Sequence, residues 1–70
     1  MTPFQIEFDR EDDGRWIAEI TALPGALVYG QSKEEAVRNV EALALRILAD
    51  RVESGAEVPE VAGAFRLAAV

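Results

Sequence analysis

Short runs of apolar residues, two of them alternating with polar residues, occupy the first part of the chain. From Pro3 to Phe8, and again from Arg15 to Ile20, apolar and polar positions alternate with period two. This alternation is typical of half-buried strands, because successive side chains point to opposite faces of a sheet. A shorter apolar run, Ala26 to Tyr29, predicts a third strand. Together the three runs predict an antiparallel meander.

The same alternation predicts which side chains face the core. We expect these to be Phe4, Ile6 and Phe8 on the first strand, with Trp16, Ala18 and Ile20 on the second. Trp16 is also a candidate stacking platform for a ligand, but a tryptophan flanked by apolar residues is more often part of a core. Ile17 is expected on the opposite face, among charged neighbours.

Two polar or glycine-containing segments are expected to connect the strands. Residues 9–14, DREDDG, end in glycine and predict a hairpin connection. Residues 21–25, TALPG, predict a turn, because Pro24 presets φ and Gly25 can adopt the positive φ of a type II turn.

The spacing of apolar residues then becomes helical. Ser32 and Glu35 fit the S-x-x-E capping box, which marks a helix start. Apolar residues follow at positions 36, 37, 40, 43, 44, 47 and 48, which form one broad stripe on a helix. Gly55 is a natural residue to follow the helix end, so the helix is expected to stop near Ser54.

The remaining sequence predicts a loop over residues 56–63, which contains Pro59, and a final strand over residues 64–70. The expected order is therefore β-β-β-α-β, in a single α+β domain covering residues 1–70. A right-handed helical crossover places the fourth strand parallel to the first, with strand order 3-2-1-4 and the helix on one face of the sheet.

Composition limits both stability and chemistry. A chain of 70 residues buries a small core, and the absence of cysteine and histidine removes disulfides and the commonest transition-metal ligands. We therefore expect a homo-oligomer and no cofactor. The acidic residues Glu7 or Asp9, with Asp50 or Glu53, form no recognisable metal motif, so we predict that the protein is not an enzyme.

The net charge is −6, with seven basic and thirteen acidic residues. Such a chain is repelled by a phosphate backbone and attracts a basic partner. The first residues show no basic leader followed by a long apolar core, and no apolar run is long enough to span a bilayer, so a cytoplasmic protein with no membrane contact is expected.

Two features indicate a protein partner. Leu45 and Val52 adjoin Leu48 and widen the helix stripe beside Glu41 into a second apolar flank, and the sheet face away from the helix keeps Ile17 with at least one of the pairs Leu27/Tyr29 or Ala26/Val28. An apolar patch on so small a domain is typical of a partner surface, and the alternative is scattered surface apolar residues. The acidic run in the predicted hairpin is a further candidate for attracting a basic partner, although a solvated hairpin tip is the plainer interpretation. The candidate contact residues are Glu11, Asp12, Asp13, Glu41, Leu45, Leu48 and Val52.

The segment EDDGRWIAEITALPGALVYGQSKEEAVRNVEALALRI resembles the N-terminal domain of HicB-like antitoxins. The matching features, in order, are Gly14, Trp16, Ala18, Leu23-Pro24-Gly25, Gly30 and Ser32 to Ala36. The resemblance covers nearly the whole chain. It implies a partial ribonuclease-H-like fold without nuclease activity.

The resemblance also implies a function. A HicB-like domain is expected to bind a small basic RNA-cleaving toxin, HicA, and to neutralise it by occlusion. Full-length relatives usually append a DNA-binding segment, whereas the sequence here ends at Val70, so a short stand-alone form without direct nucleic-acid binding is expected. The alternative is a free-standing homo-oligomer of the same fold that binds another protein or a small ligand and has no toxin partner.

Overall fold

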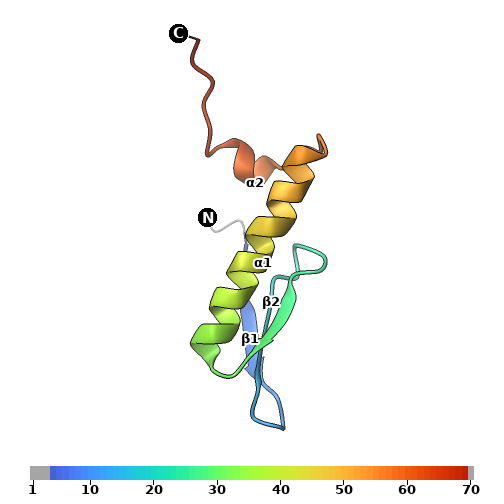
Figure 1. Cartoon of the computed structure of the whole chain (residues 1–70), viewed down its shortest axis with the longest axis vertical. Helices are drawn as coiled ribbons and strands as arrows, with labels where there is room; N and C mark the ends of the chain where they lie inside the picture. The colour runs from blue at the N-terminus through green and yellow to red at the C-terminus, as the bar shows by residue number, and fades with distance from the viewer. Residues whose placement is uncertain (1–3, 70) are drawn as a thin grey trace.

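A small antiparallel sheet followed by one long helix forms the body of the protein (Figure 1). The computed structural model describes residues 4–69. Its elements, in order, are β1 (Glu7–Arg10), β2 (Trp16–Glu19), β3 (Leu27–Gly30), α1 (Lys33–Glu53) and α2 (Pro59–Ala62). The sheet order is β1-β2-β3, with both pairs antiparallel. The predicted α+β class, meander and long helix are confirmed.

The strand register defines two faces of the sheet. Phe8, Ala18 and Val28 lie opposite one another across the three strands, and Ala18 is fully buried. Because directly opposed residues point the same way, this row faces α1. The alternating rows, Glu7–Glu19–Leu27 and Asp9–Ile17–Tyr29, therefore form the open face of the sheet.

Both predicted turns form, the first of them shorter than expected. The amide of Gly14 donates to the carbonyl of Glu11 at 2.9 Å, and Gly14 has a φ of +92°. In the second turn, the amide of Ala26 donates to the carbonyl of Leu23 at 3.0 Å, and Gly25 has a φ of +91°. These positive φ values explain the glycines, since other residues rarely adopt them.

Local sequence signals set both ends of α1. The Ser32 hydroxyl accepts a hydrogen bond from the Glu35 amide at 3.1 Å, and the Glu35 carboxylate accepts one from the Gln31 amide at 3.1 Å. At the other end, the amides of Gly55 and Ala56 donate to the carbonyls of Val52 and Arg51 at 3.1 and 3.0 Å. This paired pattern is a Schellman motif. The predicted helix start and stop are confirmed.

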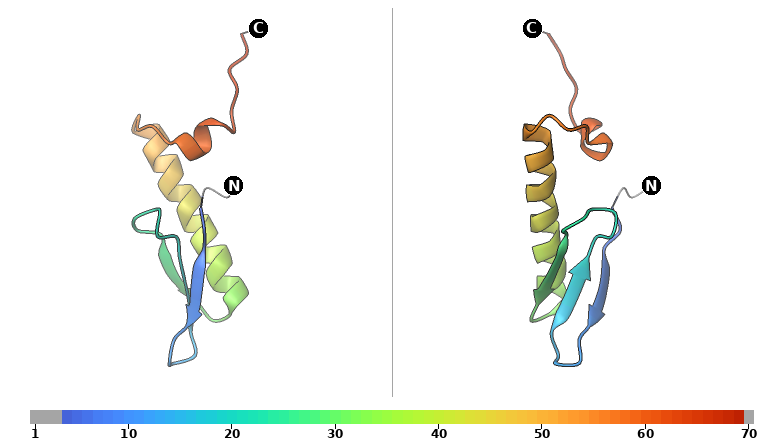
Figure 2. Two further views of the ribbon diagram at one scale, coloured as in Figure 1. Left: turned by 180° about the vertical axis from the view of Figure 1, so that it is seen from behind. Right: turned by 90° about the vertical axis from the view of Figure 1, so that its right-hand side faces the viewer.

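The core lies between α1 and the helix-facing side of the sheet (Figure 2). Its buried residues are Ala18, Ile20, Leu23, Ala26, Ala36, Val40, Ala44, Leu48 and Val58. Four of them, Ala36, Val40, Ala44 and Leu48, recur every fourth residue on α1, so they line one face of the helix. Trp16 is half-buried and packs against this core, as its flanking sequence predicts.

One contact between helix and sheet is unusually close. A Cβ atom placed on Gly30 would lie 2.5 Å from the Ala36 nitrogen and 2.8 Å from the Ala36 Cα. Glycine is therefore required at this position by space and not by φ. The close approach anchors the first turn of α1 against β3.

The first strand begins later than the alternation predicts. Residues 4–6 are not in β1, which instead includes Asp9 and Arg10 from the segment predicted to be the hairpin connection. Phe4 and Ile6 still pack against the core, but Phe8 is 47% exposed. Phe8 is exposed because α1 packs chiefly over β2 and β3 and leaves the β1 edge largely uncovered.

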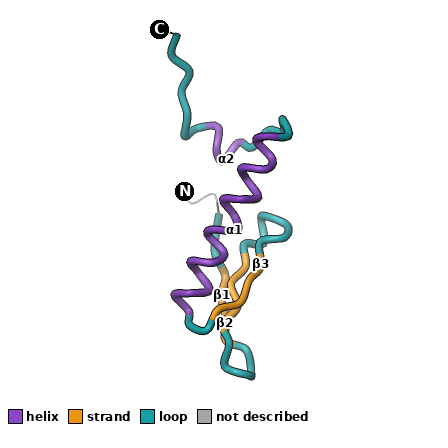
Figure 3. Tube along the Cα trace, viewed as in Figure 1, coloured by secondary structure: helices purple, strands orange, loops and turns teal. Residues whose placement is uncertain are grey.

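The prediction for the last fifteen residues is wrong in two respects. The expected loop over residues 56–63 contains the short helix α2, and the described part of the expected fourth strand, residues 64–69, forms no strand. Figure 3 shows this segment as a loop that leads away from the sheet. A strand in a sheet needs a hydrogen-bonded neighbour, and residues 64–69 have none within the described chain. Pro3 and Val70, the outer ends of the two predicted strands, lie outside the described residues.

A candidate protein-binding surface at each end of the fold

The β1–β2 hairpin carries most of the net charge of the protein. Residues 7–19 contain six carboxylates and two arginines, which gives a net charge of −4 out of −6 for the whole chain. The three acidic residues of the tip, Glu11, Asp12 and Asp13, lie at the turn between the strands. The acidity predicted to attract a basic partner is therefore concentrated at one end of the molecule.

One carboxylate of this tip is already engaged. The Asp13 carboxylate accepts hydrogen bonds from the Arg15 amide at 3.0 Å and from the Arg15 Nε at 2.7 Å. The backbone hydrogen bond from Arg15, supported by the Arg15 guanidinium, lowers the pKa of Asp13 below its ordinary value. The guanidinium carbon of Arg15 also lies 4.3 Å from the ring centroid of Tyr29. Asp13 thus orders the hairpin, while Asp12 has no ion pair among the residues described.

The open face of the sheet combines apolar and acidic side chains. Leu27 and Tyr29 are both exposed, and Ile17 lies between their strand and β1. By the strand register, Glu19 lies beside Leu27 and Asp9 lies beside Ile17, with Glu7 next to Glu19 on β1. Exposed aromatic and aliphatic side chains bordered by charged ones are typical of protein interfaces.

The predicted apolar flank of α1 lines two adjoining grooves. The lower groove, of about 240 Å³, is lined by Phe4, Ile6, Ile20, Glu41, Ala44, Leu45 and Leu48. The upper groove, of about 370 Å³, is lined by Leu45, Leu48, Ala49, Val52, Glu53, Val61 and Phe65. Leu45 is 68% exposed and Val52 is 52% exposed. The apolar surface is therefore continuous from residues 4–6, before β1, to α2.

A third hollow lies where α2 folds back beside the end of α1. Its volume is about 540 Å³, and its lining residues are Val52, Ala56, Glu57, Val58, Pro59, Val61, Ala62 and Phe65. Only Val58 of this set is buried. Phe65, at its rim, is 78% exposed.

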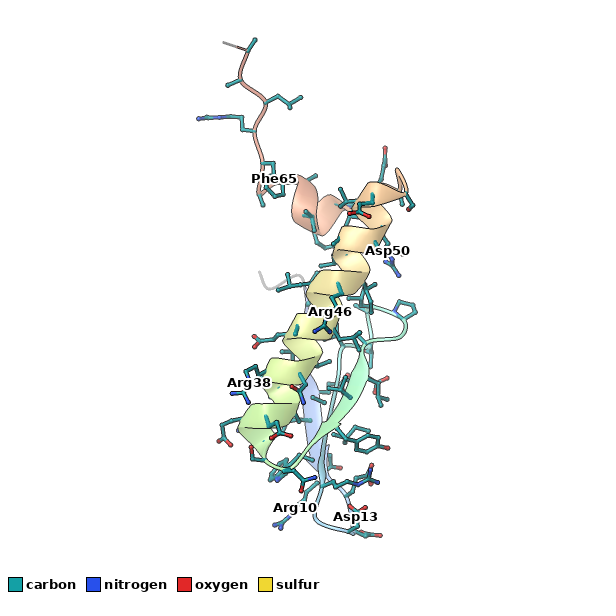
Figure 4. The ribbon with its side chains drawn as sticks, viewed as in Figure 1. Arg10, Asp13, Arg38, Arg46, Asp50 and Phe65 are labelled. Atoms are coloured by element: carbon teal, nitrogen blue, oxygen red, sulfur yellow. The ribbon has the colours of Figure 1, made fainter. Side chains whose placement is uncertain are left out.

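The structure divides the predicted contact residues into two groups. It brings Glu41, Leu45, Leu48 and Val52 together along the grooves, but it places the Glu11–Asp13 tip at the other end of the molecule. Figure 4 shows this separation, with Asp13 at the hairpin end and Phe65 at the far end. Leu48 is buried in the core, so it forms a groove wall and not an exposed anchor.

Several groove residues were not identified from the sequence. The alternation places Phe4 and Ile6 in a strand, and Val61 and Phe65 lie in segments that predict a loop and a strand. The alternation of Phe65 and Leu67 was a usable signal, because it marks two apolar side chains on the same side of an extended segment. The alternation does not show that, within residues 4–69, no strand or helix packs over these two side chains.

The structure does not bring together the acidic residues considered above as metal ligands. Glu7 and Asp9 lie on the open face of the sheet, whereas Asp50 and Glu53 lie on α1, beyond the other face. Among residues 4–69, no three acidic side chains gather closely enough to hold a metal ion. Within the same residues, no helix has both the length and the apolar character that a membrane span requires.

Comparison with family models, with curated proteins and with solved structures finds no significant match for this chain.

Proposed function

We propose that this protein is a non-catalytic, antitoxin-like binding module that neutralises a small basic RNA-cleaving toxin by occlusion. The observation that carries the proposal is the concentration of net charge −4 in the β1–β2 hairpin, beside an exposed apolar group on the open sheet face. The order of motifs shared with HicB-like antitoxins supplies the partner class.

The acidic hairpin would guide the encounter. A field of one sign at one end of a small protein raises the association rate with an oppositely charged partner and makes that rate dependent on salt. Glu11 and Asp12 are better placed for this role than Asp13, because Arg15 already neutralises the Asp13 carboxylate in part.

The open sheet face would supply the affinity. Apolar and aromatic side chains at the centre of an interface usually contribute most of the binding energy. Leu27 and Tyr29 are exposed here, and the guanidinium of Arg15 lies over the Tyr29 ring. A basic protein seated on this face would have its RNA-binding surface covered, so inhibition requires no catalytic residue.

The proposal is tested by an RNA-cleavage assay with a small basic RNA-cleaving protein encoded beside this chain. Excess protein should abolish cleavage, and the substitution Leu27→Asp should lower the affinity by roughly tenfold or more, as expected for an anchor in an interface. Complete cleavage in the presence of excess protein would refute inhibition.

A matched pair of charge variants tests the hairpin. The double substitution Glu11→Gln with Asp12→Asn should slow association and flatten its salt dependence. The control, Glu57→Gln with Glu60→Gln, removes the same charge from exposed positions at the other end of the molecule. Equal association rates for the two variants would contradict a steering role for the hairpin.

A second candidate function is a free-standing homo-oligomer of the same fold. The observation in its favour is the exposure of Phe65 and Leu67, which are 78% and 100% exposed in the single chain. Monomeric proteins rarely leave adjoining large apolar side chains in water without a partner. Light scattering of the purified protein tests it: a mass of one 7.6 kDa chain would exclude this function.

A further inference from the structure

Residues 64–69 lead away from the rest of the protein. In every view the segment leaves α2 and points away from the sheet (Figures 1 and 2). The radius of gyration is 14.6 Å, whereas a compact chain of this length is expected near about 11 Å. The protein therefore holds an apolar segment outside its own fold.

The sequence of this segment suits a strand. Phe65 and Leu67 alternate with Arg66, so an extended backbone puts the two apolar side chains on one face and the guanidinium on the other. Six residues span about 20 Å in a strand, which is longer than the four-residue β1. The segment is thus long enough to cover β1 from end to end.

The edge of β1 is the available place for such a strand. Within residues 4–69, β1 is bonded to β2 on one side and to no strand on the other. The opposite edge is less open, because α1 packs over β3 and Asn39 donates a hydrogen bond to the Tyr29 carbonyl at 3.3 Å. An open strand edge is a template for pairing with another chain.

The two faces of β1 match the two faces of the segment. On the helix-facing side, β1 presents the half-exposed Phe8, two residues after Ile6, which lines the lower groove. On the open side it presents the carboxylates of Glu7 and Asp9, opposite in charge to Arg66. One orientation of the added strand therefore buries Phe65 and Leu67 against the helix side and places Arg66 among the carboxylates.

We propose that residues 64–69 form a strand on the β1 edge of a second copy of the chain, so that two copies exchange these segments about a two-fold axis. The inference rests on the homo-oligomeric assembly proposed above and identifies the surface that it uses. The partner is a second copy because the segment points away from its own sheet. The exchange also gives backbone hydrogen-bond partners to the segment and to the open β1 edge in both copies. The predicted fourth strand then exists only in the assembly.

The first test compares two double variants by light scattering. Phe65→Asp with Leu67→Asp should raise the dissociation constant of the dimer by roughly 100-fold or more, since each buried side chain is worth more than a tenfold change. The control, Ala22→Asp with Gln31→Asp, adds the same charges at exposed positions and should leave the dimer intact. Circular dichroism establishes that each variant is folded.

The second test uses the absence of cysteine in the natural chain. Chains carrying only Asp9→Cys are mixed with chains carrying only Arg66→Cys and oxidised. The proposal predicts a disulfide between the two different chains. A chain carrying both substitutions that forms the disulfide within one chain, with no crosslinked dimer, would overturn exchange in favour of a fourth strand in cis.

The remaining outcomes separate the two proposals. A wild-type protein that scatters as a single chain refutes both the assembly and the exchange. A wild-type dimer that persists in the Phe65→Asp, Leu67→Asp variant keeps the assembly but refutes this surface. Neither result depends on whether the protein inhibits a toxin.

Discussion

The tight contact between Gly30 and α1 provides the sharpest test of the fold. The substitution Gly30→Ala places a methyl group 2.5 Å from the Ala36 nitrogen and 2.8 Å from the Ala36 Cα. Non-bonded heavy atoms favour separations of about 3.5–4.0 Å. Both obstructing atoms belong to the helix backbone, so no side-chain rotation relieves the clash. The first turn of α1 must instead move away from β3 by about 1 Å.

This movement should cost a large share of the stability. Overpacking a well-packed core typically costs about 1–3 kcal/mol, and the upper end is expected here because backbone must shift. A domain of this size has a total unfolding free energy of about 3.5–10 kcal/mol. With a urea dependence of about 1 kcal/mol per molar, the unfolding midpoint should fall by about 2–3 M.

The assay is urea unfolding followed by the fluorescence of Trp16, the single tryptophan, which lies directly opposite Gly30 in the sheet. The control is Gly63→Ala, because Gly63 has a φ of −73° and a Cβ there meets nothing within 4 Å. Both variants change the unfolded chain in the same way, so the difference between them isolates the clash. Equal midpoints for the two variants would refute the close approach.

Three further predictions concern the helix cap, the hairpin and nucleic acid. Ser32→Ala should lower the free energy of unfolding by about 1 kcal/mol, because it removes the acceptor for the Glu35 amide; urea unfolding measures this against a Ser54→Ala control. The pKa of Asp13 should lie below 3.8 by NMR titration and move part of the way back in Arg15→Ala, since the backbone hydrogen bond remains. Its lowered pKa means that its contribution to stability is full above the ordinary value and is lost as the pH falls through the lowered one. Finally, the protein should give no gel shift with duplex DNA at physiological salt, because its seven basic residues are scattered and its net charge is −6.

Local sequence patterns determined much of this fold. The capping box at Ser32, the glycine after the helix end and the Leu23-Pro24-Gly25 corner each depend on hydrogen bonds between residues at most six positions apart. Period-two alternation likewise identified the strands and their order in the meander, because consecutive antiparallel strands need only short turns. For the same reason, the acidic hairpin tip and the apolar flank of α1 were both visible in the sequence.

Tertiary structure alone decided where these features lie relative to one another. The separation of the acidic tip from the apolar flank follows from the length of α1, since its 21 residues carry the chain past the end of the sheet. The need for glycine at position 30 arises from the way the backbone of α1 at Glu35 and Ala36 packs against β3. The alternation in residues 64–69 marks a segment able to pair, but hydrogen-bonding partners across space determine whether it becomes a strand. A pattern along one chain specifies the faces of a segment, and only the packed structure shows which edge, if any, is free to receive it.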